Sequence, residues 1–172
     1  MKIGLLSDTH GFLDPKIFEH FKDCDEVWHA GDIGDLQVAG RLRAFKPLRA
    51  VYGNIDGKDL QAEFPENLFF DCEGLSVWIT HIGGAPPRYN PTVMERLKKE
   101  TPDIFICGHS HILRVAKDPA HHNMLYLNPG AAGNQGFHHM KTVLRFEITG
   151  KNVKNMEAIE LGRRGLITDP SL

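Results

Sequence analysis

The sequence predicts an α/β fold built on a parallel sheet. Its first half alternates short apolar segments with amphipathic ones, in the order strand, helix, strand, helix, strand. This alternation is typical of parallel strands connected by helices that pack on the sheet. The length of 172 residues suits one domain with a substantial core, and a hydrophobic fraction of 41% is ordinary for a globular protein.

Local signals justify each element of the first half. Strands are predicted at residues 2–7, 26–29 and 48–52. Asp14 is expected to cap the first helix, with Pro15 at its first helical position. Asp35 is expected to cap a second helix that ends near residue 45, where apolar residues recur at helical spacing.

The second half is predicted to consist mainly of strands. They are expected at residues 67–72, 75–81, 103–107, 113–117, 124–128, 141–148 and 152–159, with one helix at residues 91–100. No internal repeat, low-complexity tract or linker divides the chain, so we predict a single domain over residues 1–172. Residues 162–172 show little periodicity, and we expect them to form a mobile tail.

Composition and charge narrow the functional classes. The formal net charge of -2 provides no basic excess that would favour general nucleic-acid binding. The three cysteines are far apart and form no CxxC pair, which argues against a disulfide framework and favours a reducing compartment. The first apolar run is too short for a signal peptide, and no segment reaches the roughly 18 apolar residues of a membrane span. We therefore expect a cytoplasmic protein that does not enter a membrane.

Several predicted strands end in residues that bind hard or borderline cations. These candidate ligands are Asp8, His10, Asp32, Asn54, His81, His109 and His111. In an open parallel sheet the carboxyl ends of the strands lie along one edge, where ligands bind. Oxygen and imidazole donors without thiolate suit Mn, Fe or Zn. Seven donors are too many for one tetrahedral site, so the set fits two metals that share a carboxylate.

Simpler explanations exist for each residue taken alone. Asp8 and Asp32 could each cap a loop or turn, and Asn54 is a natural turn residue before Asp56-Gly57. Their occurrence together at strand ends favours the metal site. Asp8/His10 and His109/His111 are i, i+2 pairs, and on an extended backbone both members of each pair are expected to face the same side.

The motifs occur in the order found in a known family. Asp8-Thr9-His10, Gly31-Asp32, Gly53-Asn54, Thr80-His81 and Gly108-His109-Ser110-His111 span residues 8–111. Together they resemble the calcineurin-like metallophosphoesterase superfamily, specifically its small bacterial and archaeal phosphodiesterase branch. Asn128-Pro129-Gly130 resembles a further motif of that branch. The resemblance implies a two-sheet αββα sandwich, a fold shared with the metallophosphoesterase-like subunit of retromer.

The resemblance also implies roles for the candidate ligands. One divalent cation would be held by Asp8, His10, Asp32 and His111, and a second by Asp32, Asn54, His81 and His109, with Asp32 bridging. The implied activity is a phosphodiesterase acting on a small phosphate ester, in which a metal-bridging hydroxide is the nucleophile. Asp32, Asn54 and His81 are the implied catalytic residues. Mn²⁺ is the preferred metal, and Ni²⁺, Fe, Zn²⁺ and Mg²⁺ also suit these ligands.

Two positions depart from the family pattern. Many relatives carry a histidine directly after Gly-Asn, which donates a proton to the leaving group, and this chain has Ile55 there. Many also follow the counterpart of His81 with Gly-His, where this chain has Ile82-Gly83-Gly84. The metal ligands are retained, but the proton donor is left open.

Three further residues are candidate substrate contacts. Arg88 follows Pro86-Pro87 and would lie at the mouth of the site. His138 and His139 follow the Asn128-Pro129-Gly130 loop, where the family often has a Pro-Arg pair. For His29, beside the Gly31-Asp32 motif, a structural role is favoured.

Other functions stay open at this point. The same centre would serve a phosphomonoesterase or a nuclease, although the chain lacks the basic excess expected of a nuclease on long DNA. A protein-binding scaffold like the retromer subunit is a further alternative, but no ligand position is degraded here. Homo-oligomerisation is also open.

Overall fold

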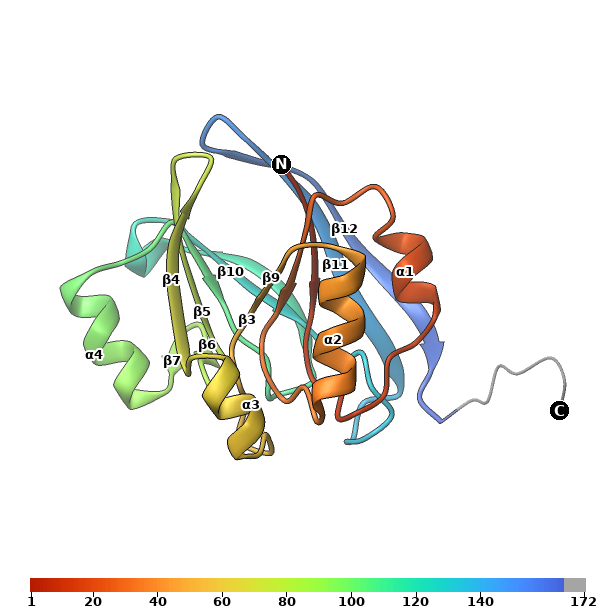
Figure 1. The fold of residues 1–172 in the computed structure, drawn as a ribbon. Helices are drawn as coiled ribbons and strands as arrows, with labels where there is room; N and C mark the ends of the chain where they lie inside the picture. Colours follow the sequence, from red (N-terminus) through yellow and green to blue (C-terminus); the bar gives the residue numbers. More distant parts are fainter. Residues whose placement is uncertain (166–172) are drawn as a thin grey trace, which may run out of the picture.

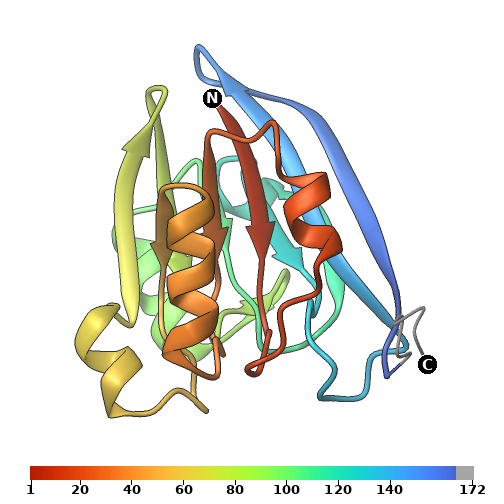
Figure 2. The same ribbon diagram turned by 45° about the vertical axis from the view of Figure 1, so that its right-hand side comes forward.

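Two β-sheets lie face to face, with helices on their outer sides (Figures 1 and 2). The computed structural model describes residues 1–165. The strands of the sheets are β1 (Lys2–Leu6), β2 (Glu26–His29), β3 (Leu48–Ala50), β4 (Asn67–Cys72), β5 (Leu75–Thr80), β8 (Ile104–Ile106), β9 (Leu113–Asp118), β10 (Met124–Pro129), β11 (Met140–Thr149) and β12 (Asn152–Arg163). The first sheet has the order β12-β11-β1-β2-β3, and the second has the order β4-β5-β8-β10-β9.

The helices cover the two outer faces. They are α1 (Lys16–His20), α2 (Leu36–Phe45), α3 (Lys58–Glu63) and α4 (Pro91–Lys99), and a short hairpin of β6 (Gly84–Ala85) and β7 (Arg88–Tyr89) precedes α4. α1 and α2 lie on the first sheet, and α4 lies on the second (Figure 1). The layer order is the αββα sandwich that the family resemblance implies.

In the first sheet, β1, β2 and β3 run parallel, so their carboxyl ends meet at one edge. Leu6 at the end of β1 lies opposite His29 of β2, and His29 lies opposite Ala50 of β3. The segments that follow these strands therefore leave the sheet side by side. A backbone hydrogen bond from Asp8 N to Gly31 O (3.0 Å) joins the first two segments.

In the second sheet, β5, β8 and β10 are parallel, and β4 and β9 flank them as antiparallel edges. The loops after β5 and β8 are joined by a hydrogen bond from Gly108 N to His81 O (3.0 Å). The His81 ring reaches the first sheet, where its Nδ1 lies 2.8 Å from Ala30 O. Both sheets therefore bring strand ends to one place.

Alternation along the strands builds the apolar layers. On β5, Val77 and Ile79 face the first sheet, whereas Trp78 between them packs with Val93 and Leu97 of α4. A separate cluster fills the space between the first sheet and α1 and α2. The apolar residues of the central strands are therefore buried on both faces of each sheet.

The ends of several elements differ from the predictions. The N-cap of α1 is Pro15, not Asp14. The Asp14 carboxylate still accepts a hydrogen bond from Lys16 N (3.0 Å), but its other oxygen binds the buried Lys141 Nζ at 2.6 Å. The capping prediction for Asp35 is confirmed, because its side chain accepts from Val38 N.

Several short segments were missed, namely α3, the β6–β7 hairpin and a 3-10 turn at Pro119–His121, and the end of β12 was misjudged. α3 was not predicted, because it is short and buries only Leu60, which leaves no apolar periodicity. β12 continues to Arg163 because it pairs with β11 up to Met140, so residues 162 and 163 lie in a strand and not in a mobile tail. Residues 166–172 of the expected tail lie outside the described residues. Among residues 1–165, no helix is long and apolar enough to cross a bilayer.

Candidate metal centre

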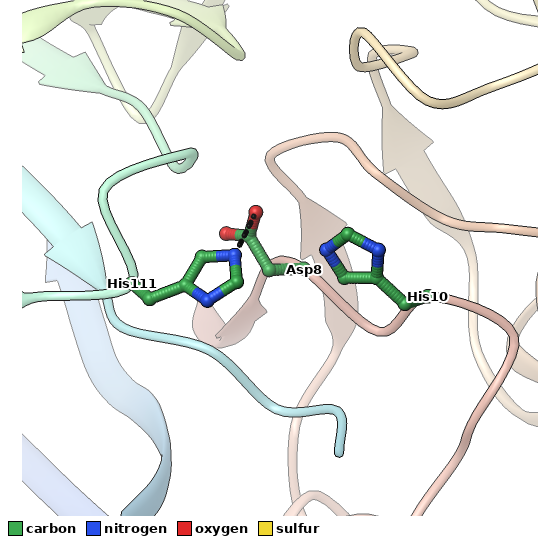
Figure 3. Close-up of side chains that lie close together, drawn as sticks. All are labelled: Asp8, His10 and His111. Carbon is green, nitrogen blue, oxygen red and sulfur yellow. Dashed lines mark ion pairs between the residues drawn. The ribbon is translucent and has the colours of Figure 1, made fainter. Parts of the chain in front are cut away.

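The predicted ligands gather in two adjacent groups of donor atoms. Donor atoms of Asp8, His10 and His111 lie within 4.8 Å of one another, as do those of Asp32, His81 and His109. Figure 3 shows the first group, in which side chains from two separate loops converge. Asp8 Oδ1 lies 3.1 Å from His111 Nε2, although the two residues are more than a hundred positions apart.

Three buried polar atoms at the centre have no hydrogen-bond partner among the described residues: Asp8 Oδ1, His10 Nε2 and His81 Nε2. Buried polar atoms are normally satisfied, and leaving one unpaired costs about 1–3 kcal/mol. All three atoms point into the space between the two groups. Carboxylate oxygens and imidazole nitrogens in this arrangement fit divalent cations.

Asp32 lies between the two groups. Its Oδ2 is 3.5 Å from His10 Nε2 and 3.2 Å from His81 Nε2. Its other oxygen, Oδ1, accepts a hydrogen bond from Ile55 N at 3.1 Å, which fixes the orientation of the carboxylate. One oxygen is therefore directed toward both groups, as a shared ligand requires.

The electrostatics of the centre favour positive charge. Burial alone would lower the pKa of His81, but the carboxylates of Asp32 and Asp8 outweigh it and raise this pKa. Burial alone would raise the pKa of Asp32, but the nearby His81 ring and the hydrogen bond from Ile55 N hold it below the ordinary value. The carboxylates that favour a proton on His81 also favour a cation in its place.

Protein contacts select the tautomers of two ligands. The Nδ1–H of His81 donates to Ala30 O at 2.8 Å, which leaves the Nε2 lone pair facing the centre. His111 Nδ1 lies 3.2 Å from His138 Nδ1, and His138 Nε2 lies 2.9 Å from Gly133 O. The Gly133 carbonyl can only accept, so a neutral His138 carries its proton on Nε2 and accepts from His111 at Nδ1. His111 Nε2 is then also free to bind a cation.

Five of the ligands have left-handed backbone conformations. The φ angles are 55° at Asp8, 47° at His10, 54° at Asp32, 66° at His109 and 59° at His111. Such angles are uncommon outside glycine and cluster at functional sites. The expectation of an extended backbone was therefore wrong for both pairs: Asp8 and His10 still lie in one group, whereas His109 and His111 belong to different groups.

Two glycines allow the ligand loops to approach each other closely. Gly31 has φ +96°, and a Cβ there would lie 2.6 Å from His81 Nδ1. A Cβ at Gly53 would collide with the Asp32 carboxylate. Any other residue at these positions would displace a candidate ligand.

Asp56 was not identified from the sequence, yet it ties two ligand loops together. Its buried carboxylate accepts hydrogen bonds from the backbone N–H groups of Ile33 (3.0 Å), Gly34 (2.7 Å) and Gly53 (2.8 Å). The only sequence signal was its position in the Asn54–Gly57 turn. The three donors that it satisfies are visible only in the tertiary structure.

His29 has the structural role that the sequence favours. It is fully buried, accepts from Gly31 N at Nδ1 (3.1 Å), and contacts Thr9 Oγ1 through Nε2 (2.9 Å). Burial lowers its pKa to about 4, so it is neutral near pH 7. It supports the Asp8 and Asp32 loops without facing the centre.

The other predicted site residues lie around the two groups. Asn54 is exposed and lines a cavity of about 490 Å³ together with His81. Arg88 lines a second cavity of about 430 Å³ together with His109. His138 has both ring nitrogens in contact with protein atoms, and His139 is exposed. Contact of any of these residues with substrate stays a prediction.

Comparison with known proteins agrees with this geometry. The family model of the calcineurin-like phosphoesterase superfamily domain matches residues 1–151. The chain belongs to this superfamily. It is 31% identical over 139 residues to a probable metallophosphoesterase of Methanothermobacter thermautotrophicus, covering 76% of this chain and 77% of that protein. It is 32% identical over 150 residues to a phosphodiesterase of Methanocaldococcus jannaschii, covering 76% and 83%.

Solved structures share the fold of this superfamily member. An archaeal phosphodiesterase aligns with a TM-score of 0.74 and 27% identity, covering 93% of this chain and 99% of the other. Vps29 from Entamoeba histolytica, solved in complex with zinc, aligns with a TM-score of 0.71 and 17% identity, covering 94% and 100%. The second likeness concerns the fold alone.

Proposed function

We propose that this phosphoesterase is a phosphodiesterase that depends on two divalent cations. The observation that carries the proposal is the position of Asp32 Oδ2, between His10 Nε2 at 3.5 Å and His81 Nε2 at 3.2 Å. A carboxylate shared by two groups of donors is the arrangement expected for a dinuclear centre. The unpartnered Asp8 Oδ1 supports it, because a cation would satisfy this buried atom.

The proposed ligands divide between the two sites. Asp8, His10, Asp32 and His111 would hold one cation, and Asp32, Asn54, His81 and His109 would hold the other. Asn54 supplies an amide oxygen from the loop after β3, and its exposure leaves it accessible to substrate as well. Mn²⁺ is the proposed metal because the donors are oxygen and imidazole without thiolate, with Ni²⁺, Fe, Zn²⁺ and Mg²⁺ as alternatives.

When bound, the cations lower the pKa of a water so that hydroxide is available as the nucleophile, and they take up charge on the phosphoryl oxygens. The residues of the chain position these groups. Asp32 is held by Ile55 N, and His81 is held by Ala30 O. Ile55 carries no proton to donate, so water or another group must protonate the leaving oxygen unless that oxygen is already a good leaving group.

Two observations support a small phosphodiester as substrate. Relatives that are named phosphodiesterases share 32% identity in one case and 27% identity with a TM-score of 0.74 in the other. The two cavities adjoin at Ile82 and Asn90, one is lined by His81 and the other by His109, and each is large enough for one arm of a diester. The net charge of -2 does not favour long nucleic acids.

We also propose a cytoplasmic location. All three cysteines are free and buried, and the structure pairs none of them. Cysteines of this kind suit a reducing compartment.

The proposal is tested with bis-p-nitrophenyl phosphate and metal-stripped protein, with and without added Mn²⁺. We expect turnover only after Mn²⁺ is restored, and none from Asp32→Ala under the same conditions. Bound metal is measured in parallel by plasma mass spectrometry. Protein that binds two cations and leaves the diester intact would contradict a phosphodiesterase. Cleavage of p-nitrophenyl phosphate in its place would then indicate a phosphomonoesterase.

A further inference from the structure

A pocket with two arginines borders the candidate metal centre. It has a volume of about 430 Å³, and we call it the arginine pocket; Arg88, His109, Ser110, Ile112, Arg114 and Tyr126 are among its lining residues. His109 belongs to the donor group of Asp32 and His81. A molecule whose phosphorus lies at that group therefore reaches the pocket directly.

The fully charged side chains that line the arginine pocket are all positive. Arg88 and Arg114 are exposed, and neither makes an ion pair with another described residue. No carboxylate lines the pocket. The nearby Asp118 is engaged elsewhere, because it accepts from Tyr89 Oη at 2.6 Å and contacts His121 Nδ1 at 2.8 Å.

The cavity of about 490 Å³ that His81 lines differs from the arginine pocket in its charged residues. It is lined by Glu66 and Glu95 as well as Arg96 and Lys99, so its full charges balance. Ile82 and Asn90 line both cavities and mark the boundary between them. The two arms of a diester would therefore meet two electrostatic environments, one balanced and one purely positive.

Strand pairing fixes the backbone positions of both arginines. Arg88 lies on β7, opposite Ala85 of β6, and Arg114 lies on β9, opposite Asn128 of β10. Tyr126 of β10 joins the two parts, because its hydroxyl donates to Gly84 O at 2.8 Å. The β6–β7 hairpin is thus anchored to the strand beside Arg114, which reduces the cost of ordering the site.

We propose that the arginine pocket binds a second phosphate carried by one arm of the diester substrate. A guanidinium matches the geometry of phosphate and forms charge-assisted hydrogen bonds with it. The inference rests on the proposed phosphodiesterase function and adds the substrate class: phosphodiesters that bear an additional phosphate, as in nucleotide-like molecules. Apolar contact with Ile112 is available to the rest of that arm.

The test compares two esters that differ only in this phosphate. They are p-nitrophenyl thymidine 5′-phosphate and the same ester with a phosphate on the 3′ oxygen. In both, water adds to the diester phosphorus, the bond from phosphorus to the aryl oxygen breaks, and p-nitrophenolate leaves. The Mn²⁺-loaded protein should cleave the 3′-phosphorylated ester with kcat/KM about tenfold higher, consistent with hydrogen bonds between charged groups.

Variants assign the preference to the two arginines. Arg88→Ala/Arg114→Ala should lose the preference, so that its kcat/KM is about equal for the two esters, because the guanidinium groups that would bind the 3′ phosphate are gone. Arg41→Ala removes the same kind of charge from α2, on the opposite side of the sandwich, and should keep the preference. Equal kcat/KM for the two esters in wild type, or a preference that survives the double substitution, would overturn the proposal.

A binding measurement separates this inference from the proposed function. If neither ester is cleaved, the phosphodiesterase proposal fails. Calorimetry with thymidine 3′,5′-bisphosphate then tests by itself whether the arginine pocket binds a phosphate. Affinity about tenfold weaker in the double variant than in wild type would still support the arginine pocket. Equal affinity would refute it.

Discussion

The Nδ1 atom of His111 lies 3.2 Å from the Nδ1 atom of His138, whose Nε2 in turn contacts Gly133 O at 2.9 Å. This chain of contacts sets the tautomer of a proposed metal ligand from a residue outside the ligand set. Partners of this kind orient ligating histidines, and losing them typically weakens metal affinity 10–100-fold.

We therefore predict that His138→Ala weakens Mn²⁺ binding by about tenfold or more. His138→Asn should recover part of the affinity, because its amide oxygen can accept from His111. The matched control is His139→Ala, which removes an exposed neighbouring histidine and should bind Mn²⁺ like wild type. Calorimetric titration of stripped protein measures all three. Equal affinity for the alanine variants of His138 and His139 would refute the positioning role.

Asp32→Ala should lose both metals. The substitution removes the oxygen that lies near both His10 and His81, so each site loses a ligand at once. Plasma mass spectrometry of the dialysed variant should find well under one metal per chain, and turnover should fall to the uncatalysed level. Asp8→Ala, which affects a single group, should keep more metal than Asp32→Ala. Two retained metals in Asp32→Ala would show that Asp32 is not shared.

Asp56→Ala should destabilise the protein by about 3 kcal/mol, because three backbone N–H groups lose a charged acceptor. It should also weaken metal binding, since the Asp32 and Asn54 loops are no longer tied. Asp35→Ala is the control: it removes the cap of α2 and should cost about 1 kcal/mol without changing metal affinity. Urea denaturation of both variants measures the difference. Similar losses of stability and of metal affinity in the two variants would contradict the proposed role of Asp56 in connecting the ligand loops.

His29 should make the metal-free protein less stable in acid. Its pKa is lowered to about 4 in the folded state from an ordinary value of 6.5, so only the unfolded chain takes up a proton between these values. The free energy of unfolding should fall as pH drops from 6.5 to 4, by about 3 kcal/mol at most. His29→Asn, which cannot titrate, should lack this component when denaturation curves are compared across the range. If the free energy of unfolding of wild type and of His29→Asn changed with pH in parallel, the predicted contribution of His29 would be contradicted.

Ile55 should limit the enzyme to substrates with good leaving groups. Wild type should cleave aryl phosphodiesters faster than alkyl ones, because no side chain at position 55 donates a proton. Ile55→His should raise the rate on alkyl diesters by about 100-fold, the lower range for general acid catalysis, and change the aryl rate far less. Ile55→Phe keeps a large side chain without a proton and should behave like wild type. Equal aryl and alkyl rates in wild type, with chemistry limiting both, would contradict this.

The sequence was sufficient to predict most elements and the candidate ligands. The apolar runs, the cap at Asp35 and the polar residues that end each strand are local signals, and each can be read without knowing the neighbours of a segment. The bounds of β2 and β4 match the predictions, and β3 and β12 differ by a few residues because their lengths depend on the strand beside them.

Only the tertiary structure decided how those residues work together. The separation of His109 from His111 depends on left-handed backbone angles that the i, i+2 spacing does not reveal. Asp56 and His138 act through atoms of segments that are distant along the chain, 22 residues away at Gly34 and 27 residues away at His111. Arg88 and Arg114 line one cavity, beside the hydrogen bond by which Tyr126 of β10 holds the β6–β7 hairpin. The sequence determined which chemical groups are present, and their distances follow from packing between segments that no local pattern encodes.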